Sequence, residues 1–233
     1  METKPDVATL EVENLTAQYP DLRRPALKVR SLILRPGERT AVLGWNGAGK
    51  TTLLLAVAGL LPFSGTVRLD GQPLTKKTAA ALRRKIGLLF AVPDDQLLFP
   101  SVREDVAFSV RQTGVPSETV ESITMELLRS FELEACADRP PFQLSHGQRQ
   151  RTALAGLLAR RPSLLLLDEP TGHLDPPGRK ELRTLLRRQS SAQLIATHDV
   201  GFAAALCQRY LWLEEGRVTR EGTDFSELTL LMD

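Results

Sequence analysis

Residues 44–52 limit the possible folds of this chain more than any other stretch of its 233 residues. They read Gly-Trp-Asn-Gly-Ala-Gly-Lys-Thr-Thr and match the phosphate-binding pattern Gly-x-x-x-x-Gly-Lys-[Ser/Thr] at every fixed position. An apolar run at 40–43 predicts a buried strand before the loop, and 51–60, closed by Gly59 and Pro62, predicts a helix after it. Strand, glycine loop and helix in this order are typical of a site for the phosphates of a nucleoside triphosphate.

The glycines of this loop let the backbone curl so that several N–H groups point at one anion, and the next helix adds its positive dipole end. In this pattern Lys50 reaches the β- and γ-phosphates, and the Thr51 hydroxyl binds Mg²⁺. We therefore expect ATP and Mg²⁺ as ligands. The other nucleotide contacts expected in the loop are Asn46, Gly47, Gly49 and Thr52.

A second motif consists of four leucines, residues 164–167, followed by Asp168 and Glu169. The leucines predict a buried strand, so both carboxylates lie at its carboxyl end, where ligands of such sheets bind. We expect Asp168 to hold Mg²⁺ together with Thr51, and Glu169 to polarise the attacking water as a general base. A strand that simply ends in an acidic turn would look the same, but the phosphate loop favours the catalytic interpretation.

Strand and helix patterns alternate around these motifs and predict an α/β fold with a mostly parallel core sheet. Expected strands are 8–15, 27–34, 66–69, 86–90, 163–168 and 193–197, with a final hairpin at 210–214 and 217–221. Expected helices are 78–85, 102–111, 117–131 (capped by Ser117), 145–160, 177–188 and 200–207. The early alternating strands predict an N-terminal antiparallel β subdomain, and the helices after residue 91 predict an inserted helical subdomain. We expect one domain over 1–233, with a core ATP-binding lobe (1–90 and 162–233) and a helical lobe (91–161).

Composition argues against several classes of protein. A formal net charge of +2 gives no strong attraction for nucleic acid. Cys136 and Cys207 lie far apart without metal-ligand spacing, as expected for a reduced, cytosolic protein. The polar N-terminus predicts no signal peptide, and no apolar run approaches the roughly 20 residues that a membrane span needs. A role at a membrane would require another chain to span it.

Further motifs resemble those of the ATP-binding cassette (ABC) ATPases. Leu144-Ser145-His146-Gly147-Gln148 is similar to the signature motif of that family, just upstream of the carboxylate strand. Leu174-Asp175 resembles the D-loop, and Thr197-His198-Asp199 resembles the segment with the switch histidine. Tyr19 stands where the family places an aromatic side chain that stacks on adenine. The motifs occur in the family's order, and the resemblance covers essentially the whole chain.

This resemblance implies an ATPase that works as a head-to-tail dimer with two ATP molecules at its interface. Ser145, Gly147 and Gln148 would bind the γ-phosphate of the nucleotide held by a second ABC ATPase subunit, at the start of a helix. His198 would reach the γ-phosphate in its own subunit and orient the water. The implied catalytic residues are Lys50, Glu169 and His198.

A narrower resemblance lies in residues 93–97 and 101–108, Pro-Asp-Asp-Gln-Leu and Ser-Val-Arg-Glu-Asp-Val-Ala-Phe. These are similar to the ATPases of energy-coupling-factor importers, which drive uptake of vitamins or of cobalt and nickel ions. The resemblance implies a transmembrane coupling protein that contacts this segment, a separate substrate-binding membrane subunit, no nucleic acid, and a peripheral position at the cytoplasmic face of the membrane. A plain surface loop and helix is the alternative.

The chain departs from the family pattern at several positions. Ala91 stands where the family has a glutamine that contacts Mg²⁺ and the water; losing such a group could cost roughly 3 kcal/mol in the barrier. Gln96 is not expected to replace it. His146 replaces a glycine, and His173 and Trp45 stand where smaller residues are usual. Each of the two imidazoles either approaches the partner's nucleotide or faces solvent.

Several functions therefore remain open. The first is an importer ATPase, which the intact Glu169 favours, and the second is a weakened, mainly regulatory ATP-binding subunit of a heterodimeric cassette pair. DNA-repair and chromosome ATPases carry long coiled coils, whereas this chain has no sustained heptads. Translation-factor relatives carry two cassettes in one chain, and this chain has one.

Overall fold

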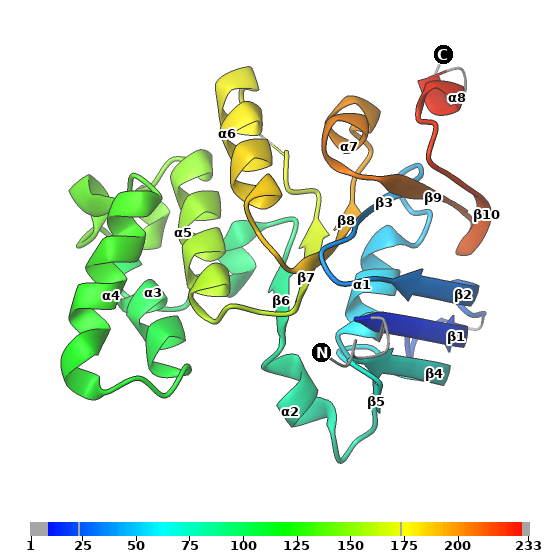
Figure 1. Cartoon of the computed structure of the whole chain (residues 1–233), viewed down its shortest axis with the longest axis horizontal. Coiled ribbons are helices and arrows are strands. Elements are labelled where there is room, and N and C mark those ends of the chain that lie inside the picture. Colours follow the sequence, from blue (N-terminus) through cyan, green and yellow to red (C-terminus); the bar gives the residue numbers. More distant parts are fainter. Residues whose placement is uncertain (1–8, 23, 173, 230–233) are drawn as a thin grey trace, which may run out of the picture.

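A mixed sheet of ten strands forms the centre of the molecule (Figure 1). The computed structural model describes residues 9–22, 24–172 and 174–229, here called the described residues. The strand order is β5-β4-β1-β2-β10-β9-β3-β8-β7-β6. The strands are β1 (Leu10–Ala17), β2 (Leu27–Leu34), β3 (Arg39–Leu43), β4 (Phe63–Leu69), β5 (Gln72–Pro73), β6 (Ile86–Leu89), β7 (Leu164–Asp168), β8 (Ala192–Ala196), β9 (Arg209–Glu214) and β10 (Arg217–Gly222). The α-helices are α1 (Lys50–Val57), α2 (Ala79–Arg83), α3 (Val102–Arg111), α4 (Ser117–Ser130), α5 (His146–Ala159), α6 (Pro176–Arg187), α7 (Val200–Leu206) and α8 (Ser226–Thr229).

The parallel half of the sheet consists of β9, β3, β8, β7 and β6. Every residue of β7 and β8 is buried, which explains why these strands are almost wholly apolar instead of alternating. The phosphate loop follows β3 and leads into α1, and Asp168 ends β7, two strands away in the same sheet. The predicted α/β class and mostly parallel core sheet are confirmed.

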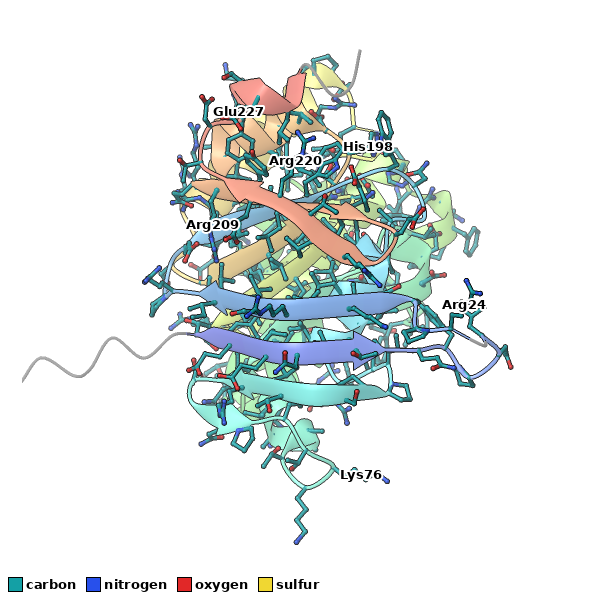
Figure 2. The ribbon with its side chains drawn as sticks, turned by 90° about the vertical axis from the view of Figure 1, so that its right-hand side faces the viewer. Arg24, Lys76, His198, Arg209, Arg220 and Glu227 are labelled. Atoms are coloured by element: carbon teal, nitrogen blue, oxygen red, sulfur yellow. The ribbon has the colours of Figure 1, made fainter. Side chains whose placement is uncertain are left out.

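The antiparallel part of the sheet consists of β5, β4, β1 and β2, whose outer face is turned toward the viewer in Figure 2. Strand β2 alternates between buried and exposed residues over most of its length, because one face lies on the core and the other meets solvent. The β9–β10 hairpin connects the two parts of the sheet. The predicted N-terminal antiparallel subdomain is therefore present.

Two apolar cores lie on opposite sides of the sheet. One surrounds α1, whose Leu53 and Leu54 are fully buried and which contacts β1, β7 and β8. The other joins the parallel strands to the helices on the opposite side. Helix α1 thus carries the phosphate loop on a firmly buried support.

Helices α3, α4 and α5 pack against one another beside the parallel strands and form the inserted helical subdomain between β6 and β7 (Figure 1). Val106, Leu128 and Leu154 belong to the apolar core that these helices share with the sheet. Arg103 on α3 forms ion pairs with Glu121 on α4 and with Asp138. The signature segment lies at the start of α5.

A few sequence predictions were wrong in detail. Ser117 is the first residue of α4 and not its cap; Pro116 holds the cap position in an extended conformation, without a side-chain cap bond. Helix α1 ends at Val57, earlier than the expected Leu60, and Gly59 turns the chain with φ +67°. Residues 93–100 lie between the expected strand 86–90 and the expected helix 102–111, and they contain a short 3₁₀ turn, η1 (Pro93–Gln96).

Among the described residues, no helix combines the length and apolar character that crossing a bilayer requires.

Candidate functional site

The phosphate loop between β3 and α1 is a turn built for glycine. Gly44, Gly47 and Gly49 have φ values of +147°, +81° and +105°, in the region that other residues rarely adopt. At Gly44 an added Cβ would lie 2.3 Å from the Leu213 carbonyl oxygen, so no side chain fits there. Alanine or a larger residue at this position would push the loop away from β9.

Lys50 is buried and lies over its own loop. Its Nζ donates to the carbonyl oxygens of Gly44 at 2.8 Å and Trp45 at 3.4 Å. The same Nζ lies 3.5 Å from Glu169 Oε1. The ammonium group is thus held by loop carbonyls and one carboxylate, at the mouth of the turn where a phosphate would lie.

Thr51 and Asp168 contact each other at the same end of the sheet. The Thr51 hydroxyl donates to Asp168 Oδ2 at 2.7 Å. The other oxygen, Oδ1, is buried and has no hydrogen-bond partner among the described residues. Burial raises the pKa of Asp168, against the opposing effect of the Thr51 hydrogen bond. An oriented, unsatisfied carboxylate oxygen beside a hydroxyl is a fitting ligand pair for a hard cation.

Glu169 lies in a left-handed backbone conformation, with φ +43°. Its Oε2 lies 2.9 Å from His198 Nδ1 and accepts hydrogen bonds from the Thr197 hydroxyl at 3.1 Å and the His198 N–H at 3.4 Å. Strained positions of this kind cost of order 1–3 kcal/mol and concentrate at functional sites. The structure thus brings Glu169, His198 and Lys50 together although they are far apart in sequence.

Tyr19 lies beside the first turn of α1. Its hydroxyl is 3.4 Å from the Thr52 hydroxyl, close enough for a hydrogen bond, and its ring packs on the core around α1. Tyr19 and Thr52 therefore lie next to the phosphate loop.

The signature segment begins α5, and its own side chains cap that helix. Ser145 Oγ accepts from the Gln148 N–H at 3.3 Å, and Gln148 Oε1 accepts from the Ser145 N–H at 2.9 Å, which is a complete capping box. Ser145 is exposed, and Gly147 approaches Leu174 in the D-loop segment. Across the described part of the chain, no hydrogen bond or ion pair joins 144–148 to the phosphate loop.

Two links from α5 were not predicted from the sequence. Arg149 donates to the Leu144 carbonyl at 2.7 Å and lies 3.1 Å from Asp94 in η1. Gln150 is buried, and its Nε2 donates to the carbonyl oxygen of Pro170, directly after Glu169. The partners lie 55 and 20 residues apart, so no local pattern in the sequence signals either contact.

The positions that depart from the ABC pattern have clear surroundings. Gln96 Oε1 accepts from the Phe90 N–H at 2.9 Å, so this side chain folds back onto the end of β6 beside the exposed Ala91. Trp45 is 52% exposed and meets the buried Trp212 edge to face, with ring centroids 6.3 Å apart. His146 is half-buried. His173 lies outside the described residues.

The residues at the loop fit a magnesium ion. Over the described residues, no three His, Cys, Asp or Glu side chains gather as a metal-binding cluster. Mg²⁺ does not need one, because it usually takes one or two protein oxygens and completes its shell with phosphate and water. The Thr51 hydroxyl and the Asp168 carboxylate offer such oxygens.

Comparison with known proteins agrees with this geometry. The family model described as "ABC transporter" matches residues 27–172, more than half of the chain. The chain belongs to the ABC transporter family. Within that family it is an ATP-binding ATPase subunit.

Relatives of this ABC subunit include proteins of bacteria and archaea. An energy-coupling factor transporter ATP-binding protein, EcfA1 of Lactiplantibacillus plantarum, is 41% identical over 92% of the chain and 78% of its own length. The protein named EcfA of Methanosphaera stadtmanae is 40% identical over 92% of the chain and 79% of its own length.

Two solved structures share the fold of this ABC chain. One is cbiO1 of Clostridium perfringens, part of the ABC transporter complex cbiONQ, with a TM-score of 0.83 and 35% identity over 96% of this chain and 91% of that one. The other is a dimeric ATP-binding cassette in a post-hydrolysis state with ADP and Pi, with a TM-score of 0.81 and 29% identity over 92% and 98% of the two chains.

Proposed function

We propose that this chain is the ATP-hydrolysing subunit of an energy-coupling-factor importer for a vitamin or a transition-metal ion. The observation that carries the proposal is the convergence of Lys50, Glu169 and His198 at the mouth of the phosphate loop. The names of the relatives, EcfA and EcfA1, support the importer type. The proposed boundaries of the two lobes are those expected from the sequence, with the helical lobe at 91–161.

Nucleotide binding would begin at the loop. The amides of Asn46, Gly47, Gly49 and Thr52 would surround the phosphates, and the Tyr19 ring would stack on adenine. A triphosphate would attract the Lys50 ammonium away from the Gly44 and Trp45 carbonyls. A hydrogen bond from the ammonium to a charged phosphate oxygen is stronger than one to a neutral carbonyl oxygen. Mg²⁺, bound by Thr51 and Asp168, would neutralise charge on the phosphates.

Hydrolysis would then use Glu169 as the general base. When Lys50 turns to the γ-phosphate, Glu169 Oε1 loses its cation and becomes available to accept a proton from water. His198 and Thr197 would keep the other carboxylate oxygen in place. The water oxygen forms a bond to the γ-phosphorus, the bond to the leaving oxygen breaks, and ADP and phosphate result.

The second half of the site would come from a partner. The exposed start of α5, with Ser145, Gly147 and Gln148, lies apart from the loop of its own chain but has the helix N-terminus that binds an anion. A second ABC ATPase subunit, identical or different, would supply this segment to the nucleotide. ATP binding would close the dimer, and hydrolysis would open it again.

The membrane partners would contact the helical subdomain. Large apolar side chains are exposed after β6 and on α3: Val92 at 52%, Leu98 at 79% and Phe108 at 43%. We propose that a transmembrane coupling protein covers them at the cytoplasmic face, while a separate membrane subunit recognises the substrate. The Asp94–Arg149 pair connects this surface to the signature helix. No nucleic acid is part of this cycle.

Purification of the chain with its membrane partners tests the proposal. We expect Mg²⁺-dependent ATP hydrolysis and co-purification of small apolar membrane proteins from the native host. If the chain hydrolyses ATP but no membrane protein co-purifies with it, the importer role is contradicted and the ATPase activity still stands. The alternative of a mainly regulatory subunit gains no support from the comparisons.

A further inference from the structure

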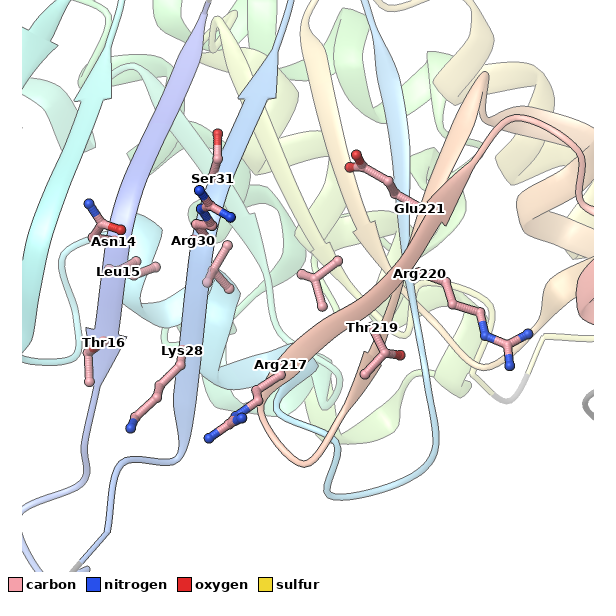
Figure 3. Close-up of a pocket in the computed structure, with 12 residues that line it drawn as sticks. Asn14, Leu15, Thr16, Lys28, Arg30, Ser31, Arg217, Thr219, Arg220 and Glu221 are labelled. Carbon is pink, nitrogen blue, oxygen red and sulfur yellow. The ribbon is translucent and has the colours of Figure 1, made fainter.

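A groove with a volume of about 750 Å³ opens on the outer face of the sheet (Figure 3). It is lined by residues of β1, β2 and β10 and by none of the residues described at the nucleotide site. It lies where the parallel strands β2 and β10 separate. They pair only at Lys28 and Arg217 and diverge beyond that bridge. Its apolar floor includes the buried Leu15 and Val29.

Four cationic residues line the groove, Lys28, Arg30, Arg217 and Arg220, and the first three face its opening. Lys28 and Arg217 extend side by side at the narrow end, and Arg30 projects outward from β2 (Figure 3). All three are exposed, and among the described residues none forms an ion pair or a side-chain hydrogen bond. Glu221 stands on the opposite wall nearer the wide end, whereas Arg220 points away from β2. The β2 side and the narrow end of the groove therefore carry positive charge, and Glu221 places one carboxylate on the β10 wall (Figure 3).

Backbone groups of both strands also face this opening. Strand β2 uses one edge to pair with β1, and its other edge has a single residue paired with β10. A sheet edge of this kind can bind another strand through main-chain hydrogen bonds. Arg209 closes the wide end by donating to the Ile33 carbonyl oxygen, so an added strand would be short.

We propose that this groove binds a short, extended acidic segment of a partner protein, which adds as a strand between β2 and β10. Carboxylates on alternate residues would face Lys28, Arg30 and Arg217, and a basic residue would face Glu221. A phosphate-bearing ligand such as a lipid headgroup or nucleic acid could neutralise the cations but could not pair with both strand edges. The proposed site rests on the groove alone and would hold whether or not the chain serves an importer.

Labelled heptapeptides and the full-length chain provide the test. The probes are Thr-Glu-Val-Glu-Val-Lys-Thr and its reverse sequence, since the added strand could run in either direction. Fluorescence anisotropy should show that one of them binds about tenfold more tightly than the charge-swapped peptide Thr-Lys-Val-Lys-Val-Glu-Thr. Arg30→Glu should weaken binding by about tenfold, and Glu221→Lys should shift the preference to a peptide whose lysine is replaced by glutamate.

Lys76→Glu serves as the matched control, because Lys76 is an exposed cation on a turn away from the groove (Figure 2). Hydrogen exchange should show slower exchange of the amides at 28–31 and 217–221 when the peptide is bound. The proposal is overturned if charge-swapped and acidic peptides bind equally, or if binding leaves those amides unprotected. It is also overturned if no peptide binds while single-stranded DNA or anionic vesicles do, in an Arg30-dependent manner.

Discussion

The phosphate loop and the signature segment both stand at the start of a helix, yet they are built differently. The loop rests on the buried helix α1, is shaped by three glycines with positive φ, and is surrounded by Lys50, Thr51 and the carboxylates of β7. The signature segment is exposed and satisfied by its own capping box. The loop therefore has its cationic and acidic partners within the chain, whereas the proposed anion at the signature segment would come with a second subunit. Three substitutions test this difference, and a fourth tests the packing of the helical subdomain that carries the signature segment.

The largest effect is expected for Glu169→Gln. Glutamine keeps the shape but cannot accept the proton, so turnover should fall by about 10²–10⁴-fold in an ATPase assay. ATP binding should persist, and ATP should hold the variant as a dimer on size-exclusion chromatography. Glu126→Gln, on the exposed face of α4, is the control. Normal turnover by Glu169→Gln would remove this residue from the mechanism.

Lys50→Ala should weaken ATP binding by about a hundredfold or more. The substitution removes the charged hydrogen bonds to the phosphates, each worth about 1.5–3 kcal/mol. Titration calorimetry measures the loss, with Lys77→Ala on an exposed turn as the control. Unchanged affinity would show that the loop does not hold the triphosphate through this side chain.

Asp105→Asn tests how α3 holds residues 98–99, which precede it and include the exposed Leu98. Asp105 accepts hydrogen bonds from the N–H groups of Leu98 at 3.1 Å and Phe99 at 3.3 Å, and burial raises its pKa to about 6. Because this pKa is above the unfolded value, the native state favours the protonated carboxyl. The stability that this group contributes is present at low pH and lost as pH rises through about 6.

Relative to Asp105→Asn, the wild type should therefore lose up to about 3 kcal/mol of unfolding free energy as pH rises from about 4 to about 8. Urea denaturation at several pH values measures this difference. Asp95→Asn, at an exposed carboxylate, should show no such trend. A difference that grows in the opposite direction would mean that the two hydrogen bonds outweigh burial.

The smallest effect on stability is expected for Ser145→Ala. Loss of the α5 cap should cost about 1 kcal/mol. ATP binding by the single chain should not change, because the loop is remote, whereas ATP-driven dimerisation should weaken. Ser101→Ala is the matched control, since Ser101 caps α3 in the same way by accepting from the Glu104 N–H at 3.3 Å. Equal dimerisation of both variants would argue against a role for the signature segment.

The sequence predicted those parts of the fold whose signals are local. The boundaries of β2 were predicted correctly, because the strand alternates between core and solvent. The buried strand β7 and the helices α3 and α5 were found within one or two residues, since apolar periodicity sets them. Ser117 was expected to cap α4, but Pro116 holds the cap position and Ser117 is the first residue of the helix.

Contacts between distant residues could not be predicted in this way. The sequence indicated Lys50, Asp168 and Glu169 through motifs, but it gave no sign that Glu169 is held between Lys50 and His198. The Asp94–Arg149 and Gln150–Pro170 contacts depend on how α5 packs on the sheet. The separation of β2 from β10 likewise depends on the curvature of the whole sheet, which no short pattern encodes.

Gly216 connects the phosphate loop to the groove between β2 and β10 through its own peptide groups. Its N–H donates to the Ala48 carbonyl oxygen of the phosphate loop at 2.9 Å, and its carbonyl oxygen accepts from the Lys28 N–H at 2.6 Å, where β2 meets β10. An added Cβ would lie 2.3 Å from the Ala26 carbonyl oxygen, so the position admits only glycine. If a strand bound between β2 and β10 shifts Gly216, it changes the affinity of the phosphate loop for nucleotide. Nucleotide must then change the affinity for that strand by the same factor, because binding free energies at two coupled sites are reciprocal.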